Sequence, residues 1–315
     1  MPLFHFGFSA MASVNELQIW ADAETDARRC ADAAIADALR IEAKYSRYRD
    51  DSVVTQINRE AGRAEVPIDP ETAALLRYAD QCYRLSGALF DITSGALRRA
   101  WDFRRTPPRL PTSAEREAAA SAIGWCDVEW SEHAIRLPRP GMEIDFGGIC
   151  KEYAADRMAA LCIEHGLEHV LVNLGGDVRA AGPQQDGAPW RIGIRHPRRA
   201  GEVIATVELA DGALATSGDY ERFFEIDGCR YCHLLNARTG WPVRYWQSVS
   251  VVAPLCVVAG SCSTIAMLLE AAGEAFLDSQ GVRYLAITED GTLTGPFAPP
   301  IDADPSTRYI IRSAP

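Results

Sequence analysis

One of the six histidines, His233, lies in a stretch that is rich in groups able to hold a phosphate or to move a proton. The stretch runs from 215 to 243 and reads ATSGDYERFFEIDGCRYCHLLNARTGWPV. Its glycines supply the turns of a hairpin, but a hairpin does not need a histidine between a Thr-Ser-Gly-Asp-Tyr turn and an Arg-Thr-Gly turn. Because imidazole titrates near neutral pH, His233 is a candidate for proton transfer or for contact with an anion. The alternative is a histidine packed in the core.

The same stretch has the C-x-x-C-H spacing of a haem-attachment site, with Cys229, Cys232 and His233. We expect no haem, because the N-terminal residues lack the features of an export signal and adjacent positions of a strand face opposite sides. A zinc site from the same three residues lacks an evident fourth ligand. The histidine therefore needs another explanation.

A second candidate is the segment from 143 to 156, which reads EIDFGGICKEYAAD. An expected strand ends at Asp145, and Gly147 and Gly148 precede the N-terminus of an expected helix, where free N–H groups suit an anion. Lys151 lies in the first turn of that helix, where the helix dipole disfavours a cation. A tight turn alone explains the glycines, but the lysine indicates a role beyond helix stability.

Two further segments combine a loop with a polar or aromatic group. The residues from 89 to 95 read LFDITSG, in which Asp91 or Thr93 caps the following helix or Asp91 meets a nucleotide. Tyr48 lies in the loop before a short helix that Ser52 caps. A loop aromatic such as Tyr48 usually contributes packing. The segment from 170 to 182, VLVNLGGDVRAAG, is typical of two strands joined by a Gly-Gly turn and indicates fold rather than chemistry.

In this order the motifs resemble those of the FAD:protein FMN transferase (ApbE-type) family. The family patterns are F-D-I-T-x-G-x-L, D-L-G-G-I-A-K-G-Y-A-x-D and Y-x-H-x-x-x-x-x-T-G, and the resemblance extends from about Met11 to Leu269. It implies an enzyme that moves FMN from FAD to a Thr or Ser hydroxyl of an acceptor flavoprotein. A phosphoester forms, AMP leaves and Mg²⁺ assists. It also implies an α+β fold of mostly antiparallel sheets with packed helices, related to the T-fold.

The resemblance assigns roles to individual residues. It implies that His233 lies against the FAD pyrophosphate and assists phosphoryl transfer, and that Tyr48 stacks on a flavin or adenine ring. The other implied FAD contacts are Met11, Leu89, Phe90, Asp91, Asp145 and Lys151. The implied metal ligands are the Gly148 carbonyl and Thr264.

Several positions depart from the family pattern, among them Gly260 and Glu152. The family's metal motif, A-D-x-x-x-T, places Asp and Thr four apart on one helix face, and oxygen ligands of this kind suit a hard cation. This chain reads AGSCST from 259 to 264, so Gly260 replaces the aspartate and Thr264 is kept. Glu152 replaces a glycine of the pattern, with no consequence that the sequence shows. Losing a carboxylate is expected to weaken Mg²⁺ binding and slow catalysis, unless another acid takes its place.

Gly260 leaves two alternative functions open. One is a protein on the same fold that binds or stores FAD without transferring FMN. The other is a metal-dependent FAD pyrophosphatase that releases AMP and free FMN.

Composition limits the remaining possibilities. The chain has 315 residues and a net charge of −11, which argues against general nucleic-acid binding. Its nine cysteines are odd in number and scattered, so we expect no disulfide framework and a reducing compartment. We expect no apolar run of membrane-spanning length, and hence a cytoplasmic protein. A single domain is expected, with a core at about 11–290 and a surface tail at 291–315.

The hydrophobic pattern predicts the elements that must hold these motifs. Helices are expected at 23–44, 53–58, 70–86, from 113, from 149 to about 165, and at 259–271. Strands are expected at 14–20, 128–137, 142–146, 169–174, 178–181, 190–195, 203–209, 213–216, 248–253 and 284–288.

Overall fold

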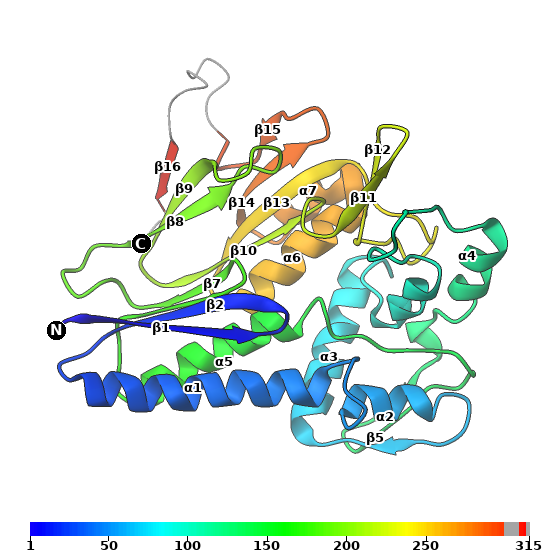
Figure 1. Cartoon of the computed structure of the whole chain (residues 1–315), viewed down its shortest axis with the longest axis horizontal. Helices are drawn as coiled ribbons and strands as arrows, with labels where there is room; N and C mark the ends of the chain where they lie inside the picture. The colour runs from blue at the N-terminus through cyan, green and yellow to red at the C-terminus, as the bar shows by residue number, and fades with distance from the viewer. Residues whose placement is uncertain (299–308, 313–315) are drawn as a thin grey trace.

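An eight-stranded sheet forms the centre of the computed structural model, which describes residues 1–298 and 309–312 (Figure 1). Neighbouring strands in it are antiparallel, with the order β1-β2-β6-β7-β10-β13-β14-β15. The expected α+β fold is therefore confirmed. The strands are β1 Leu3–Ala10, β2 Ser13–Trp20, β6 Val170–Leu174, β7 Asp177–Ala181, β10 Gly212–Gly218, β13 Trp246–Ala253, β14 Arg283–Thr288 and β15 Leu293–Thr294.

Three helices cover one face of this sheet (Figure 1). They are α1 Glu24–Tyr45, α5 Cys150–Glu164 and α6 Cys256–Leu269. Helix α5 packs against both α1 and α6, and α6 packs against β10 and β13. The buried stripe of α1 is mostly alanine at helical spacing, which lets the neighbouring helix approach closely. Its buried residues are Ala27, Cys30, Ala31, Ala34, Ala38, Ile41 and Tyr45.

A second group of elements lies beside the C-terminal end of α1 (Figure 1). The helices are α2 Val53–Arg59, α3 Pro70–Leu85 and α4 Ser113–Ala120, with 3-10 segments η1 Ile92–Arg99 and η2 Trp125–Asp127. A small sheet contains β3 Val66–Pro67, β4 Glu129–Trp130 and β5 Ala134–Arg136.

An aromatic cluster joins this group to the hairpin of β11 Phe223–Ile226 and β12 Cys229–Cys232. Trp101 stacks on Phe224 and Tyr231 with ring centroids 6.1 and 6.0 Å away, and its indole N–H donates to the carbonyl of Gly240 at 2.7 Å. Because His233 directly follows β12, this cluster sets the position of His233.

Two expected strands differ in the structure. The segment 142–146 is extended but belongs to no strand ladder, because the side chain of Asn58 pairs with the main chain of Ile144 instead. The segment 128–137 divides into β4 and β5, since a turn at 131–133 reverses the chain. In the segment 142–146, Met142, Ile144 and Phe146 are buried in alternation. The sequence therefore has the pattern of a half-buried strand although no partner strand is present there.

Strand β1 was missed in the sequence. It pairs with β2 along its whole length through a two-residue turn, in which Met11 and Ala12 have φ values of 53° and 59°. Such a turn normally carries Asn or Gly, so its sequence gives no signal here.

One stretch, Cys256–Ser279, is long and apolar enough to cross a membrane by length and composition alone. The expectation that no apolar run reaches that length is wrong for this stretch. It comprises α6, the 3-10 turn η3 Glu270–Ala272 and α7 Gly273–Ser279. Most of it is buried inside the fold, as in a core helix.

The remaining strands form a small sheet of β8 Trp190–Arg195, β9 Val203–Leu209 and β16 Tyr309–Arg312, in which β16 runs parallel to β9. Within the expected surface tail at 291–315, β15 pairs with β14 and Phe297 is buried. Residues 299–308 and 313–315 of that tail lie outside the described residues.

Candidate active site

His233 has an imidazole nitrogen available for chemistry. Its backbone N–H donates to the carbonyl of Arg222 at 3.0 Å, whereas its buried ring Nδ1 has no hydrogen-bond partner in the described part of the chain. Burial, together with the charges of Arg222, Lys151 and Arg47, lowers the pKa of His233 to about 4. At neutral pH the ring is therefore uncharged and able to accept a proton.

This neutral state predicts a pH dependence of stability. Between pH 6.5, the ordinary pKa, and about 4, His233 takes up a proton in the unfolded chain but not in the folded one. Its contribution to the free energy of unfolding is therefore present above pH 6.5 and is lost toward pH 4, by up to about 1.4 kcal/mol per pH unit. Urea unfolding at several pH values should show a shallower acid loss for His233→Gln than for the parent. Parallel profiles would contradict the prediction.

Lys151 is paired with an acid that the sequence analysis did not select. Its Nζ lies 2.6 Å from a carboxylate oxygen of Asp177, whose side chain is only 5% exposed. Burial lowers the pKa of Lys151, but the charges of Asp177 and Glu152 offset this, so the pKa lies above its ordinary value. The ion pair explains how a lysine is tolerated in the first turn of α5.

The Gly-Gly turn between β6 and β7 places Asp177 next to Lys151. Gly175 has φ +59°, and a Cβ at this position would lie 2.8 Å from the Cβ of Ser13 in the β1–β2 turn. It would also lie 3.8 Å from the Lys151 Nζ. Only glycine allows these two turns and the lysine to come this close.

Asp145 and Tyr48 are brought together by Arg47, which the sequence analysis also missed. Arg47 forms an ion pair with Asp145 and donates to the Tyr48 hydroxyl at 2.8 Å. Its guanidinium lies 5.0 Å from the centre of the Tyr48 ring, and that of Arg104 lies 5.6 Å from it. Burial alone would raise the pKa of Tyr48. The effects of Arg47, Arg104 and Arg222 lower it by a larger amount, so the net pKa lies below its ordinary value. Three arginines thus lie close enough to Tyr48 to affect its pKa, in a protein of net negative charge.

Asp91 is committed to hydrogen bonds within the protein. One carboxylate oxygen accepts from the N–H and hydroxyl of Thr93 at 2.7 and 2.6 Å, and the other accepts from the N–H of Trp125 at 3.2 Å. It therefore caps η1 and holds η2 against it, which agrees with the capping alternative. Its predicted contact with FAD stays a prediction.

Three other predicted FAD contacts, Leu89, Phe90 and Met11, pack in or against the main hydrophobic core. Leu89 and Phe90 are buried, and the Phe90 ring lies 3.3 Å from the place where a Cβ on Gly148 would be. The Met11 N–H donates to Glu42 at 2.6 Å, and its side chain packs on the core. A side chain at position 148 would therefore require Phe90 to shift by a few tenths of an ångström.

Thr264 belongs to a group of hydroxyls between α6 and β10. The hydroxyl of Ser217, in the Thr-Ser-Gly-Asp-Tyr motif, lies 2.9 Å from that of Thr264 and 2.8 Å from that of Ser263. The motif at 215–220 and the helix at 256–269 therefore meet at this point.

Gly260 and Glu152, which both depart from the family pattern, lie against each other. A Cβ on Gly260 would lie 2.5 Å from Cγ and 2.8 Å from Oε1 of Glu152. The Glu152 side chain is buried, and its Oε2 has no hydrogen-bond partner among the described residues. Burial, reinforced by the charge of Asp177, raises the pKa of Glu152 to about 8.

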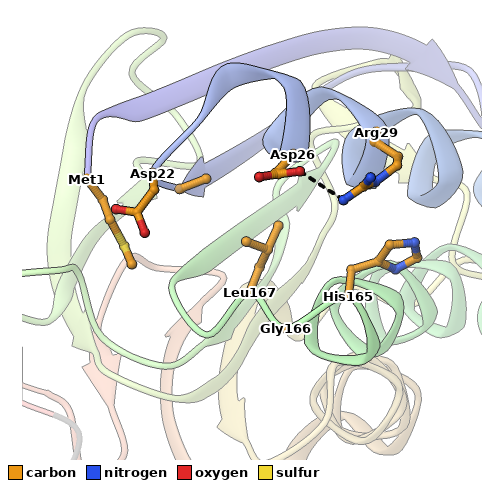
Figure 2. A pocket seen from close by; sticks show the side chains of 8 residues that line it. Met1, Asp22, Asp26, Arg29, His165, Gly166 and Leu167 are labelled. Atoms are coloured by element: carbon orange, nitrogen blue, oxygen red, sulfur yellow. Dashed lines mark hydrogen bonds and ion pairs between the residues drawn. The ribbon is translucent and has the colours of Figure 1, made fainter.

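Two surface hollows are lined by none of the predicted site residues. Figure 2 shows one of them, in which the Asp26–Arg29 ion pair lies opposite His165 and Leu167. No predicted site residue lines it. The other hollow is lined by Ser13, Gly175 and Gly176, among others, and so borders the turns that hold Lys151.

Comparison with known proteins decides the family. Residues 11–286 match the sequence profile of the ApbE family. This chain belongs to the ApbE family. Among curated relatives, a "FAD:protein FMN transferase" of Treponema pallidum is 34% identical over 71% of this chain and 67% of its own length. A "FAD:protein FMN transferase" of Vibrio cholerae is 31% identical over 79% of this chain and 76% of its own length.

Solved ApbE structures show the same fold. The ApbE protein of Thermotoga maritima superimposes with a TM-score of 0.85 at 31% identity, covering 93% of this chain and 97% of that one. The flavin transferase ApbE of Vibrio cholerae gives 0.81 at 26% identity, with coverage of 93% and 97%. The family resemblance and the ApbE-like fold expected from the motifs are both confirmed.

Proposed function

We propose that this ApbE-family protein transfers FMN from FAD to a Thr or Ser hydroxyl of an acceptor flavoprotein. The observation that carries the proposal is a neutral His233 with an unpartnered ring nitrogen near Lys151, Arg47 and Arg222. Cations suit a pyrophosphate, and a neutral imidazole suits removal of a hydroxyl proton. The names of the curated relatives support the same activity.

In this reaction the acceptor oxygen bonds to the phosphorus on the FMN side of the FAD pyrophosphate. The bond from that phosphorus to the bridging oxygen breaks, and AMP leaves with the bridging oxygen. His233 accepts the hydroxyl proton, while Lys151 and the arginines offset the negative charge of the phosphates. Tyr48 offers its ring to a flavin or adenine base.

The residues present fit a Mg²⁺ ion. Hard cations prefer oxygen ligands, and α5 and α6, which pack together, carry the Thr264 hydroxyl and a buried, unpartnered carboxyl oxygen of Glu152. Because the described residues contain no group of three His, Cys, Asp or Glu side chains that could hold a metal, hydroxyl and carbonyl oxygens must contribute. We propose the Gly148 carbonyl and Thr264 as two ligands. A bound Mg²⁺ would neutralise charge on the pyrophosphate.

The test supplies FAD and Mg²⁺ together with an extract from a bacterial strain that lacks its own flavin transferase. We expect AMP release and a protein band that stays fluorescent after denaturation. Peptide mass spectrometry should place FMN on a Thr or Ser. AMP with free FMN and no labelled protein would establish the pyrophosphatase instead. Tight FAD binding without AMP release would establish a binding protein.

Tyr48 offers a prediction on FAD affinity. Its side chain is 65% exposed, so Tyr48→Ala should change the free energy of unfolding by less than about 0.5 kcal/mol. A base–aromatic stack is worth on the order of 1–3 kcal/mol, so the FAD dissociation constant should rise roughly tenfold or more. Flavin fluorescence titration measures this. Tyr48→Phe is the matched control and should retain most of the affinity; equal losses in both variants would point to the hydroxyl rather than the ring.

We also propose that the protein is cytoplasmic. All nine cysteines are free thiols, including the buried Cys30 and Cys162, which is compatible with a reducing compartment. Cell fractionation with an antibody to the chain tests this.

A further inference from the structure

Gly260 and Glu152 depart from the family pattern in opposite senses. Position 260 has lost a carboxylate and become glycine, while position 152 has gained a carboxylate in place of glycine. They lie far apart in the sequence, on α6 and α5, and the packing of these helices brings them together.

The Glu152 side chain occupies the space that a side chain at 260 would fill. A Cβ on Gly260 would lie within 3.0 Å of three Glu152 atoms, namely Cγ at 2.5 Å, Oε1 at 2.8 Å and Cδ at 2.9 Å. Real Cβ atoms essentially never show contacts this short, so a larger residue at 260 requires the Glu152 side chain to move from this position. Glu152 therefore favours glycine at position 260.

The contact with Gly260 also places the Glu152 side chain against the helix that carries a predicted metal ligand. Gly260 and Thr264 are four residues apart on α6 and therefore share one helix face. A side chain that lies against Gly260 is therefore on the face of α6 that carries Thr264. In the sequence, Glu152 lies four residues after Gly148, the other predicted ligand.

An ionised Glu152 has no dedicated partner among the described residues. The neighbouring cation, Lys151, is engaged with Asp177 at 2.6 Å, and the Glu152 Oε2 accepts no hydrogen bond from any described residue. Burial of a carboxylate is costly unless a cation or a proton compensates it. Asp156, the next acid on α5, is already used to cap α6 through the N–H groups of Cys256 and Val257.

We propose that Glu152 supplies the carboxylate ligand to Mg²⁺ that the family pattern takes from position 260. The proposal rests on the Mg²⁺ dependence of the proposed function. The anionic ligand has moved from α6 to α5 while the place it occupies is kept, so the chain retains a charged metal site despite Gly260.

The test measures metal binding rather than turnover. Mn²⁺ is titrated into the full-length protein with and without FAD, and free Mn²⁺ is followed by electron paramagnetic resonance. Glu152→Gln keeps the shape and removes the charge, and we expect its Mn²⁺ affinity to fall at least tenfold. In metal sites generally, the loss of groups that only support the ligands lowers metal affinity by about 10- to 100-fold, so the loss of a ligand should lower it by roughly tenfold or more. Glu164→Gln, at the exposed end of α5, is the matched control and should bind Mn²⁺ as the parent does.

A reciprocal exchange gives an independent test. Glu152→Gly with Gly260→Asp rebuilds the family arrangement and should recover Mn²⁺ affinity to within a few-fold of the parent. Gly260→Asp alone should lower the unfolding midpoint, because its side chain collides with Glu152. The single changes are thus expected to be strongly non-additive.

The outcomes separate this proposal from the proposed function. Unchanged Mn²⁺ affinity in Glu152→Gln, in a protein that does transfer FMN, overturns the ligand role and leaves the function intact. Reduced affinity that the exchange restores, in a protein without transfer activity, supports the ligand role and removes the function. If the exchanged variant folds, as judged by circular dichroism, but binds Mn²⁺ no better than Glu152→Gln, the proposal is also overturned.

Discussion

Replacing His233 with glutamine is expected to slow FMN transfer by roughly 10²- to 10⁴-fold, the usual contribution of a positioned general base. Glutamine keeps polar atoms near the pyrophosphate but cannot accept the hydroxyl proton. FAD affinity should therefore change much less than the rate. Single-turnover AMP release measures the chemical step, and flavin fluorescence measures binding.

The control for His233 is His165→Gln, because His165 is exposed at the C-terminal end of α5 and its ring bonds the carbonyl of Leu161 within its own helix. His165→Gln should leave the rate of FMN transfer and the FAD affinity unchanged. A loss of FAD affinity as large as the loss of rate would show that His233 binds FAD without taking part in proton transfer. The parent's rate should also fall below about pH 4, as the imidazole becomes protonated.

Replacing Lys151 with methionine is expected to reduce both stability and FAD affinity. Asp177 is left buried without its partner at 2.6 Å, and breaking such a pair costs about 3–5 kcal/mol when both groups are buried. Because the Lys151 side chain is 30% exposed, we expect a cost near the lower end, about 3 kcal/mol. Urea unfolding measures this loss, and FAD titration should show weakening of at least about tenfold, since a charge-assisted contact to phosphate is lost.

A double variant separates the two effects of Lys151. Lys151→Met with Asp177→Asn removes the unpaired charge, so most of the stability should return. FAD affinity should stay low, because the cation proposed to contact the FAD phosphates is still missing. If affinity recovers together with stability, Lys151 serves the fold alone and the predicted FAD contact is wrong.

Local patterns account for what was predicted well. Alternation from 14 to 20 and the alanine-rich helical spacing of α1 reflect burial of one face, which each segment records in its own residues. The strand predicted at 142–146 is wrong for a related reason. Burial alternates along this segment as in a strand, but the side chain of Asn58, rather than another strand, bonds the main chain of Ile144. Local patterns also missed β1, whose turn at Met11 and Ala12 lacks the usual turn residues.

The sequence by itself determined the family and the α+β fold class, because each motif is a short run of residues that can be recognised within the chain. It could not show which residues meet. The pairing of Lys151 with Asp177, the link from Asp145 to Tyr48 through Arg47, and the contact of Glu152 with Gly260 all join segments distant in sequence or in different elements. Such contacts are decided by how helices and turns pack around one core, and packing distances are set by the whole fold rather than by any single segment.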